Sequence, residues 1–220
     1  IGEDGVQWGA HGLGPAPNSE WMALSSRPDE RLLLIRSEQE HFPPDCQEEI
    51  RQERMILLDE ETTFPPCRIE IVLGLEGRLF VILPTGVSLD LPFACNAPFM
   101  QDPARIEIKD PASSPTNRWL LERAGRLAAN AVLAWVSDSA LTIEERAAAY
   151  DLLPGVSWEE DSLENSCAEV VREAVDGALG KRPFLLTETG DLETRGNCQA
   201  VPEAVLETWT PEQVSTFFTE

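Results

Sequence analysis

The stretch that decides the fold runs from Leu79 to Val136 and reads LFVILPTGVSLDLPFACNAPFMQDPARIEIKDPASSPTNRWLLERAGRLAANAVLAWV. It starts with an apolar run typical of a β-strand, continues through a loop interrupted by prolines, and ends in a long amphipathic segment. Apolar residues recur in that last segment at helical spacing: Leu120, Ala124, Leu127, Ala128, Ala131 and Trp135. Because the serine, proline and threonine residues at 113–116 are typical helix-start signals, we predict a helix from there to Val136.

Strands are predicted on the amino-terminal side of this helix. Arg31–Arg36 is a candidate for a buried strand. Two largely apolar segments, Arg68–Leu75 and Arg78–Leu83, are separated by Glu76-Gly77 and predict a β-hairpin. The sequence therefore indicates at least three strands before the long helix.

Prolines interrupt the segment that follows the predicted hairpin. Pro84-Thr85-Gly86 predicts the turn that closes the hairpin. Residues 87–99 are extended in character but contain Pro92 and Pro98. Since proline cannot donate to a β-ladder, we predict an edge strand or a loop that crosses the sheet.

Three further helices are predicted outside the deciding stretch. Asp45–Arg54 has acidic residues in its first turn and arginines near its end, the charge order that suits a helix dipole. Thr142–Leu152 opens with a capping-box pattern, and Ser162–Leu179 is followed by Gly180. Beyond them, we predict a short β-hairpin around Gly190-Asp191 and a terminal helix from Thr210 to Phe218.

Helices and strands therefore alternate along the chain, and the fold class predicted is mixed α/β (α+β). We divide the chain into three parts. Residues 1–30 are rich in glycine and proline and predict a linker or the edge of a domain. Residues 31–136 predict the main α/β domain, and residues 137–220 predict a mostly helical extension with a short hairpin.

The composition excludes several classes of partner. The chain has 220 residues and a formal net charge of -22, so its field repels nucleic acid and anionic membrane surfaces. No apolar run is long enough to cross a bilayer, and no signal peptide is recognisable. Five scattered cysteines without a C-x-x-C pair argue against a zinc site and a disulfide framework, and they fit a cytoplasmic protein.

Three motifs suggest chemistry but have ordinary explanations. His41 and Cys46 are close in sequence, yet nothing orients them as base and nucleophile. The acidic run at 158–161 lacks the spacing of a calcium loop, and the glycine-rich run at 9–14 does not follow a predicted strand. No nucleophile, base and orienting group converge in the sequence, so a self-contained hydrolase is not indicated.

Positive charge gathers in one place only. Five cations lie between residues 101 and 126: Arg105, Lys109, Arg118, Arg123 and Arg126. Polar residues such as Thr116 and Asn117 mark the helix start, where free N–H groups favour an anion. A cation in the first helical turn is locally unfavourable, so Arg118 fits either a bound phosphate or a salt bridge to Glu122.

At these residues the chain resembles a known superfamily. The order LFVILPTG, LPFACNAPF, DPAR and SPTNRWLLERAGRLAA is similar to the segment after the ATP-binding domain in sacsin-like proteins of the gyrase, ninety-kilodalton heat-shock chaperone, histidine kinase and MutL superfamily. The resemblance is most specific over residues 79–136 and extends more loosely to residues 34–54 and 182–187. It implies a β-α-β transducer or middle domain that packs against the nucleotide domain and responds to the γ-phosphate.

The resemblance also implies roles for particular residues. Asn117-Arg118 matches the position from which a chaperone arginine reaches the γ-phosphate, and Lys109 is the candidate for the lysine that gyrase and MutL use. Arg105, Asn117 and Thr116 are candidate binding residues. The chain lacks the nucleotide-domain motifs, so we expect no cofactor here, with ATP and Mg in the full-length protein. Since the chain begins at Ile1 and not at methionine, we expect the nucleotide-binding domain upstream.

Two functions follow. The first is a transducer-like domain, not catalytic alone, of a larger cytosolic ATPase that couples nucleotide state to chaperone-like or remodelling work on a protein client. The alternative is a structural or protein-interaction module that uses exposed aromatic residues: Trp158, Trp209, Phe217 and Phe218.

Overall fold

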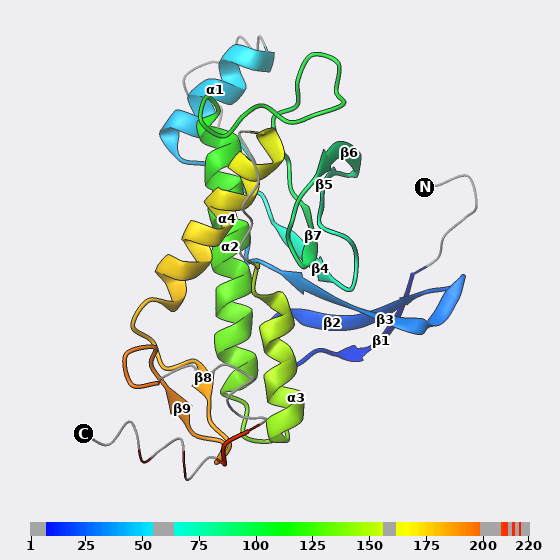
Figure 1. Cartoon of the computed structure of the whole chain (residues 1–220). Helices are drawn as coiled ribbons and strands as arrows, with labels where there is room; N and C mark the ends of the chain where they lie inside the picture. Colours follow the sequence, from blue (N-terminus) through cyan, green and yellow to red (C-terminus); the bar gives the residue numbers. More distant parts are fainter. Residues whose placement is uncertain are drawn as a thin grey trace.

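The computed structural model describes residues 8–54, 64–155 and 162–198, together with 208–210, 213 and 216. Their fold is mixed α/β, as the sequence predicts: a seven-stranded mixed sheet packs beside helices, and a two-stranded sheet follows (Figure 1). The strands are β1 (Trp8–Leu13), β2 (Ser19–Leu24), β3 (Arg27–Arg36), β4 (Glu70–Leu73), β5 (Arg78–Val81), β6 (Leu83–Ser88), β7 (Phe93–Asn96), β8 (Leu185–Leu186) and β9 (Leu192–Glu193). The helices are α1 (Pro44–Arg54), α2 (Pro115–Val136), α3 (Ile143–Ala147), the 3₁₀ helix η1 (Ala148–Leu152) and α4 (Leu163–Leu179).

The large sheet has the strand order β1-β2-β3-β4-β7-β5-β6. β5 and β7 run parallel, and the other neighbouring pairs are antiparallel. The predicted strand Arg31–Arg36 is confirmed as the buried half of β3, where Leu33 and Ile35 are completely buried.

β4 and β5 form where the sequence predicts strands, but the predicted hairpin between them is wrong. β7 lies between the two: Leu73 of β4 is opposite Phe93, and Leu79 of β5 is opposite Cys95. Phe93, Ala94 and Cys95 are all buried, so both faces of β7 are covered, as is typical of a central strand. The buried apolar run, not the turn signal at 76–77, therefore decides which strands pair.

Residues 87–99 were expected to be an edge strand or a crossing loop, and this prediction is wrong for β7. The segment contributes the end of the edge strand β6 and all of the central strand β7. Pro92 directly precedes β7 and Pro98 follows it, so neither proline occupies a ladder position within the strand.

The turn predicted at Pro84-Thr85-Gly86 is also displaced, because these residues lie within β6. The chain reverses at Ile82, between the paired residues Val81 and Leu83, and the φ angle of Ile82 is 67°. The Thr85 hydroxyl donates to the Leu79 carbonyl oxygen at 2.9 Å and accepts the N–H of Val87 at 3.2 Å; the second bond, between residues two apart, is of the kind that threonine forms in turns. A threonine–glycine pair after proline can therefore lie in an edge strand.

The amino-terminal segment predicted as a linker or domain edge contains two strands. β1 and β2 pair with each other, and β2 pairs with β3, so residues 8–24 extend the sheet. The glycine-rich run at 9–14 lies largely in β1 and forms no phosphate-binding loop. Gly14 follows the strand, where a Cβ atom would collide with the side chains of Ser19 and Leu33, so this glycine allows the close return of β2.

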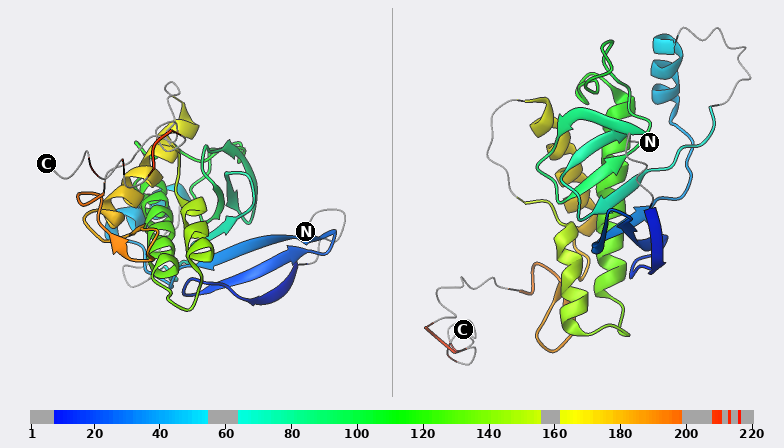
Figure 2. Two further views of the ribbon diagram at one scale, coloured as in Figure 1. Left: turned by 60° about the horizontal axis from the view of Figure 1, so that its bottom comes forward. Right: turned by 90° about the vertical axis from the view of Figure 1, so that its right-hand side faces the viewer.

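α2 supplies the helical side of the core. Its buried residues belong to the same hydrophobic cluster as Leu33, Ile71 and Phe93 of the sheet. In the right-hand view of Figure 2 the sheet lies in front of α2 and α4, which run side by side. The predicted helix ending at Val136 is confirmed, and with 22 residues it is the longest in the described chain.

The residues after α2 tie its carboxyl end to the small hairpin. The predicted capping box at Thr142 is present, and the predicted helices over 142–152 and 162–179 form as α3 with η1 and as α4. Arg146 is 8% exposed and donates to the carbonyl oxygens of Val136, at 2.5 Å, and Gly190, at 2.9 Å. The Tyr150 hydroxyl donates to Phe184 and accepts from the N–H of Leu186. The positive charge of Arg146 is favourable at the carboxyl end of α2, where the helix dipole is negative. Its bond to Gly190 also holds the predicted hairpin β8–β9 against this end of the helix.

Two expectations concern the ends of the chain and its relation to membranes. The terminal helix predicted from Thr210 to Phe218 falls mostly outside the described residues. Among the helices that are described, none combines the length and apolar character needed to cross a bilayer.

Candidate functional site at the start of α2

A single buried asparagine joins the loop before α2 to the helix. Asn117 is completely buried, and its side-chain oxygen accepts the N–H of Met100 at 2.7 Å. Its side-chain nitrogen donates to the carbonyl oxygens of Met100 and Lys109, at 2.9 and 2.8 Å. Both amide protons are therefore used within the protein, and Asn117 holds the loop in place.

The free N–H groups expected at the start of α2 have acceptors within the chain. Pro115 has no N–H, and the N–H of Asn117 donates to the Ser114 side chain. The N–H of Thr116 donates to the Glu49 carboxylate at 2.9 Å, across from α1. The sequence predicts an anion at this helix end, and the structure places there a carboxylate of α1. Thr116 is itself completely buried, and its hydroxyl lies 3.4 Å from the carbonyl oxygen of Cys46.

The candidate phosphate-binding cations do not share one partner. Lys109 forms an ion pair with Glu53 of α1. Arg118 pairs with Glu122 at 3.3 Å, and its side chain remains 54% exposed. The salt-bridge interpretation of Arg118 is thus the arrangement observed here, but an exposed i,i+4 pair is weak and holds the guanidinium loosely.

Arg105 lies at the tip of an exposed turn. Its φ angle is 58°, and the turn is closed by Asp102, which accepts the N–H groups of Ala104, Ile106 and Glu107. These hydrogen bonds lower the pKa of Asp102 because they favour the charged carboxylate. Arg105 is therefore held by its backbone and leaves its side chain exposed.

Residues that sequence reasoning missed come from α1 and the segment before it. Glu49 and Glu53 bind the start of α2 and Lys109, and Glu40 forms an ion pair with Arg123. Arg123 also lies over the ring of Trp119, 5.8 Å from its centroid. These contacts join distant parts of the chain, so the sequence gives little sign of them. The one available signal is the number of acidic residues between 38 and 53, which could pair with the cations of residues 101–126.

The cysteines offer no activated nucleophile at this site. Burial is the largest cause that raises the pKa of Cys46, Cys95 and Cys167 to about 12, so all three remain thiols near neutral pH. Cys46 is 1% exposed, which supports an ordinary core role for this partner of the His41–Cys46 pair. The described residues also contain no group of three side chains suited to a metal ion.

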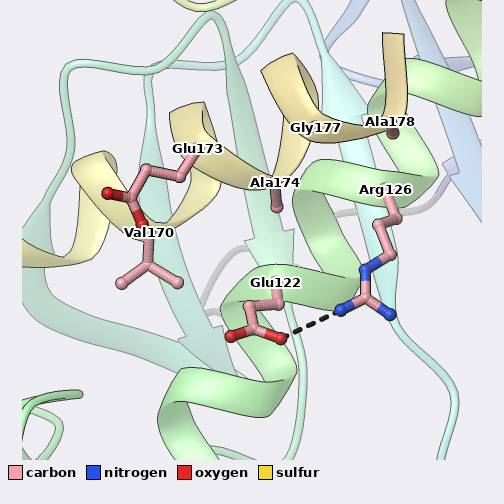
Figure 3. A pocket seen from close by; sticks show the side chains of 7 residues that line it. All are labelled: Glu122, Arg126, Val170, Glu173, Ala174, Gly177 and Ala178. Carbon is pink, nitrogen blue, oxygen red and sulfur yellow. Dashed lines mark hydrogen bonds and ion pairs between the residues drawn. The ribbon is translucent and has the colours of Figure 1, made fainter. Parts of the chain in front are cut away.

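A groove of about 470 Å³ runs between α2 and α4 (Figure 3). Small residues of α4, among them Ala174 and Gly177, line one side, and the ion pair between Glu122 and Arg126, at 2.9 Å, lines the other. Arg126 therefore stands on the ridge of α2 beside this groove. The acidic run at 158–161 and the aromatic residues Trp158, Phe217 and Phe218 lie outside the described residues.

Compared with protein-family models, with curated proteins and with solved structures, the chain gives no match. The superfamily resemblance over residues 79–136 therefore stays an expectation that rests on those residues.

Proposed function

We propose that this chain is a transducer-like domain, not catalytic alone, of a larger cytosolic ATPase, and that it couples nucleotide state to chaperone-like or remodelling work. One observation carries the proposal: the exposed side chain of Arg118 is weakly bound, while the backbone at the start of α2 is held in place by the neighbouring Asn117. Its own contact is an exposed pair with Glu122, whereas Asn117 beside it is buried and locked to the preceding loop. Such a cation can reach a γ-phosphate presented by another domain without a rearrangement of the helix.

α2 also offers a path along which a change at Arg118 could spread. A straight helix of 22 residues is about 33 Å long at 1.5 Å per residue. Its far end is capped by Arg146, which also binds the hairpin β8–β9. A shift of α2 would therefore move the hairpin together with the helix.

The chemistry required of this chain is modest. Phosphoryl transfer depends on positioning and on stabilising charge, and a cation from a second domain serves that purpose. Among the described residues, the start of α2 does not suit ATP, because its N–H groups already donate to Glu49 and Ser114, and no cluster of side chains suits Mg²⁺. The upstream domain would hold both.

The full-length coding sequence tests the proposal at low cost. We expect the codons before Ile1 to encode the helix asparagine, the D-x-G-x-G motif and the glycine-rich lid of the superfamily's nucleotide domain. A complete upstream sequence without these motifs would contradict the proposal and favour an interaction module.

The alternative function, a protein-interaction module, is favoured by a strained and exposed apolar turn. Ile82 is 89% exposed although its φ angle of 67° is unfavourable for a β-branched residue. Leu83 and Ile106 are 64% and 61% exposed at the same sheet edge, where Gly86 donates to the Ile106 carbonyl oxygen. Backbone strain kept at an exposed apolar side chain is typical of a functional surface.

Two glycine substitutions at this turn distinguish relief of backbone strain from the loss of stability that glycine normally causes by making the unfolded chain more flexible. We expect Ile82→Gly to raise the free energy of unfolding by about 1 kcal/mol, because glycine adopts positive φ freely and keeps the N–H bond to Asn96. Leu83→Gly, at the neighbouring exposed position with ordinary φ, should lower it by about 0.5–1 kcal/mol. Chemical denaturation measures both, and a loss of stability in Ile82→Gly would show that the turn stores no strain.

A further inference from the structure

A cavity of about 270 Å³ lies between the end of β3 and the middle of α2. It is next to the groove of Figure 3, since Arg126 lines both. Its floor is apolar: Ile35 is completely buried, Ala131 is 3% exposed, and Leu127 is partly buried beside them. We call it the β3–α2 cavity. A floor of this kind favours a ligand with an apolar body.

Two arginines one helical turn apart form the wall of the β3–α2 cavity. Arg123 is the more buried, with its side chain 24% exposed, and it is paired with Glu40. Burial and the charge of Arg126 both lower the pKa of Arg123, which shows that the two cations act on each other. Among the described residues Arg126 pairs with Glu122, which lines the groove of Figure 3 but not the cavity, while Arg126 lines both. The carboxylates of Glu38 and Glu40 also line the cavity. Of the two wall arginines, Arg126 is therefore the one whose ion-pair partner lies outside the cavity.

Asn130 adds a hydrogen-bond donor next to Arg126. The two residues are four positions apart on α2, so their side chains project from adjacent turns. Asn130 lines the cavity, is exposed, and its side chain forms no hydrogen bond with any residue that the structure describes. The nearby Glu38 carboxylate accepts a hydrogen bond from Asn18 at 2.6 Å.

We propose that the β3–α2 cavity binds a small organic monocarboxylate, with its carboxylate on Arg126 and Asn130 and its apolar body on Ile35, Leu127 and Ala131. Arginine matches a carboxylate through two parallel N–H bonds. The volume lies just below the range of about 300–1,000 Å³ for drug-sized ligands, so the cavity suits a single ring or short chain and not a nucleotide. A monoanion also suffers less repulsion than phosphate from the net charge of -22. This site is independent of the proposed role of Arg118.

Benzoate is a suitable probe, and ¹H–¹⁵N NMR titration of the whole chain in about 0.15 M salt locates its binding. We expect saturable shifts of the Asn130 side-chain amide and of the backbone amides of Leu127 and Ala131. Benzamide has the same shape without the charge and should bind at least about tenfold more weakly. Equal binding of benzamide, or tighter binding of inorganic phosphate, would overturn the proposed ligand class.

A matched pair of arginine variants tests whether benzoate binds in the β3–α2 cavity. Arg126→Gln should weaken benzoate at least about tenfold, since it removes a charged hydrogen-bond donor from the rim. Arg118→Gln removes the same charge and a contact to the same Glu122, but it lies outside the cavity and should change the affinity less than about twofold. Equal losses in the two variants, or shifts that map away from α2 residues 127–131, would contradict the site.

Discussion

Asn117→Ala is expected to lower the free energy of unfolding by about 3–4 kcal/mol, although it removes only three heavy atoms. The substitution leaves the N–H and carbonyl of Met100 and the carbonyl of Lys109 without their side-chain partner in a buried place. A buried backbone group without a partner costs about 1–3 kcal/mol. Two groups lose theirs here, the Met100 N–H and the Lys109 carbonyl oxygen, whereas the Met100 carbonyl oxygen still accepts the N–H of Lys109 at 2.8 Å. Urea denaturation followed by circular dichroism measures the loss.

Asn130→Ala is the matched control for Asn117→Ala. It makes the same change on the same helix, but at an exposed side chain without a hydrogen bond to the described residues. We expect it to change stability by less than about 0.5 kcal/mol. Hydrogen exchange should be faster at the Met100 amide in Asn117→Ala but not in Asn130→Ala, because the Met100 N–H donates to the Asn117 side chain. A stability loss below about 1 kcal/mol in Asn117→Ala would contradict the anchoring role given to this side chain.

Gly125→Ala is expected to lower the free energy of unfolding by about 3 kcal/mol, because it forces α2 and α4 apart. An added Cβ would lie 2.5 Å from the carbonyl oxygen of Val171 and 2.7 Å from the Cβ of Ala174. The first of these atoms is backbone, so no side-chain rotation relieves the contact. The two helices pack directly against each other, so relief of the collision requires one helix to move away from the other.

Gly177→Ala makes the same change on the facing helix, where a Cβ would meet nothing within 4 Å. Alanine has the higher helix propensity, so this variant should gain up to about 1 kcal/mol. Thermal denaturation of both variants provides the comparison. If Gly125→Ala is as stable as the unchanged protein, α2 and α4 do not approach each other at Gly125 as closely as the structure has it.

Elements with local signals could be predicted from the sequence. α2 has apolar residues at helical spacing and a serine–proline start, and α3 has its capping box within four residues. α4 has Ser162 as its N-cap and Gly180 as its C-cap, and the hairpin β8–β9 turns around Gly190. In each of these elements, the residues that signal its start or end lie within a few positions of it in the sequence.

Strand pairing could not be predicted, because it depends on distant segments. β7 separates β4 from β5 although the chain between those two strands looks like a hairpin turn. β1 and β2 lie among glycines and prolines that suggest a linker, yet β1 pairs with β2 and β2 pairs with β3. Between β4 and β5 a non-local partner overrides the local turn signal.

The candidate site could be predicted in part. The sequence identifies the start of α2 as a place for an anion and leaves open a pair between Arg118 and Glu122, which the structure contains. It could not identify Glu49 as the carboxylate there, since 67 residues separate Glu49 from Thr116.

ATP turnover by the full-length protein tests the central claim most directly. We expect Arg118→Ala to slow single-turnover hydrolysis by at least about a hundredfold, with ATP affinity changed less than about twofold, because the arginine stabilises charge that develops on the transferred phosphoryl group. Arg126→Ala, which removes the other arginine bound to Glu122, should leave turnover within about twofold. Unchanged turnover in Arg118→Ala, or a full-length protein that hydrolyses no ATP, would contradict the account.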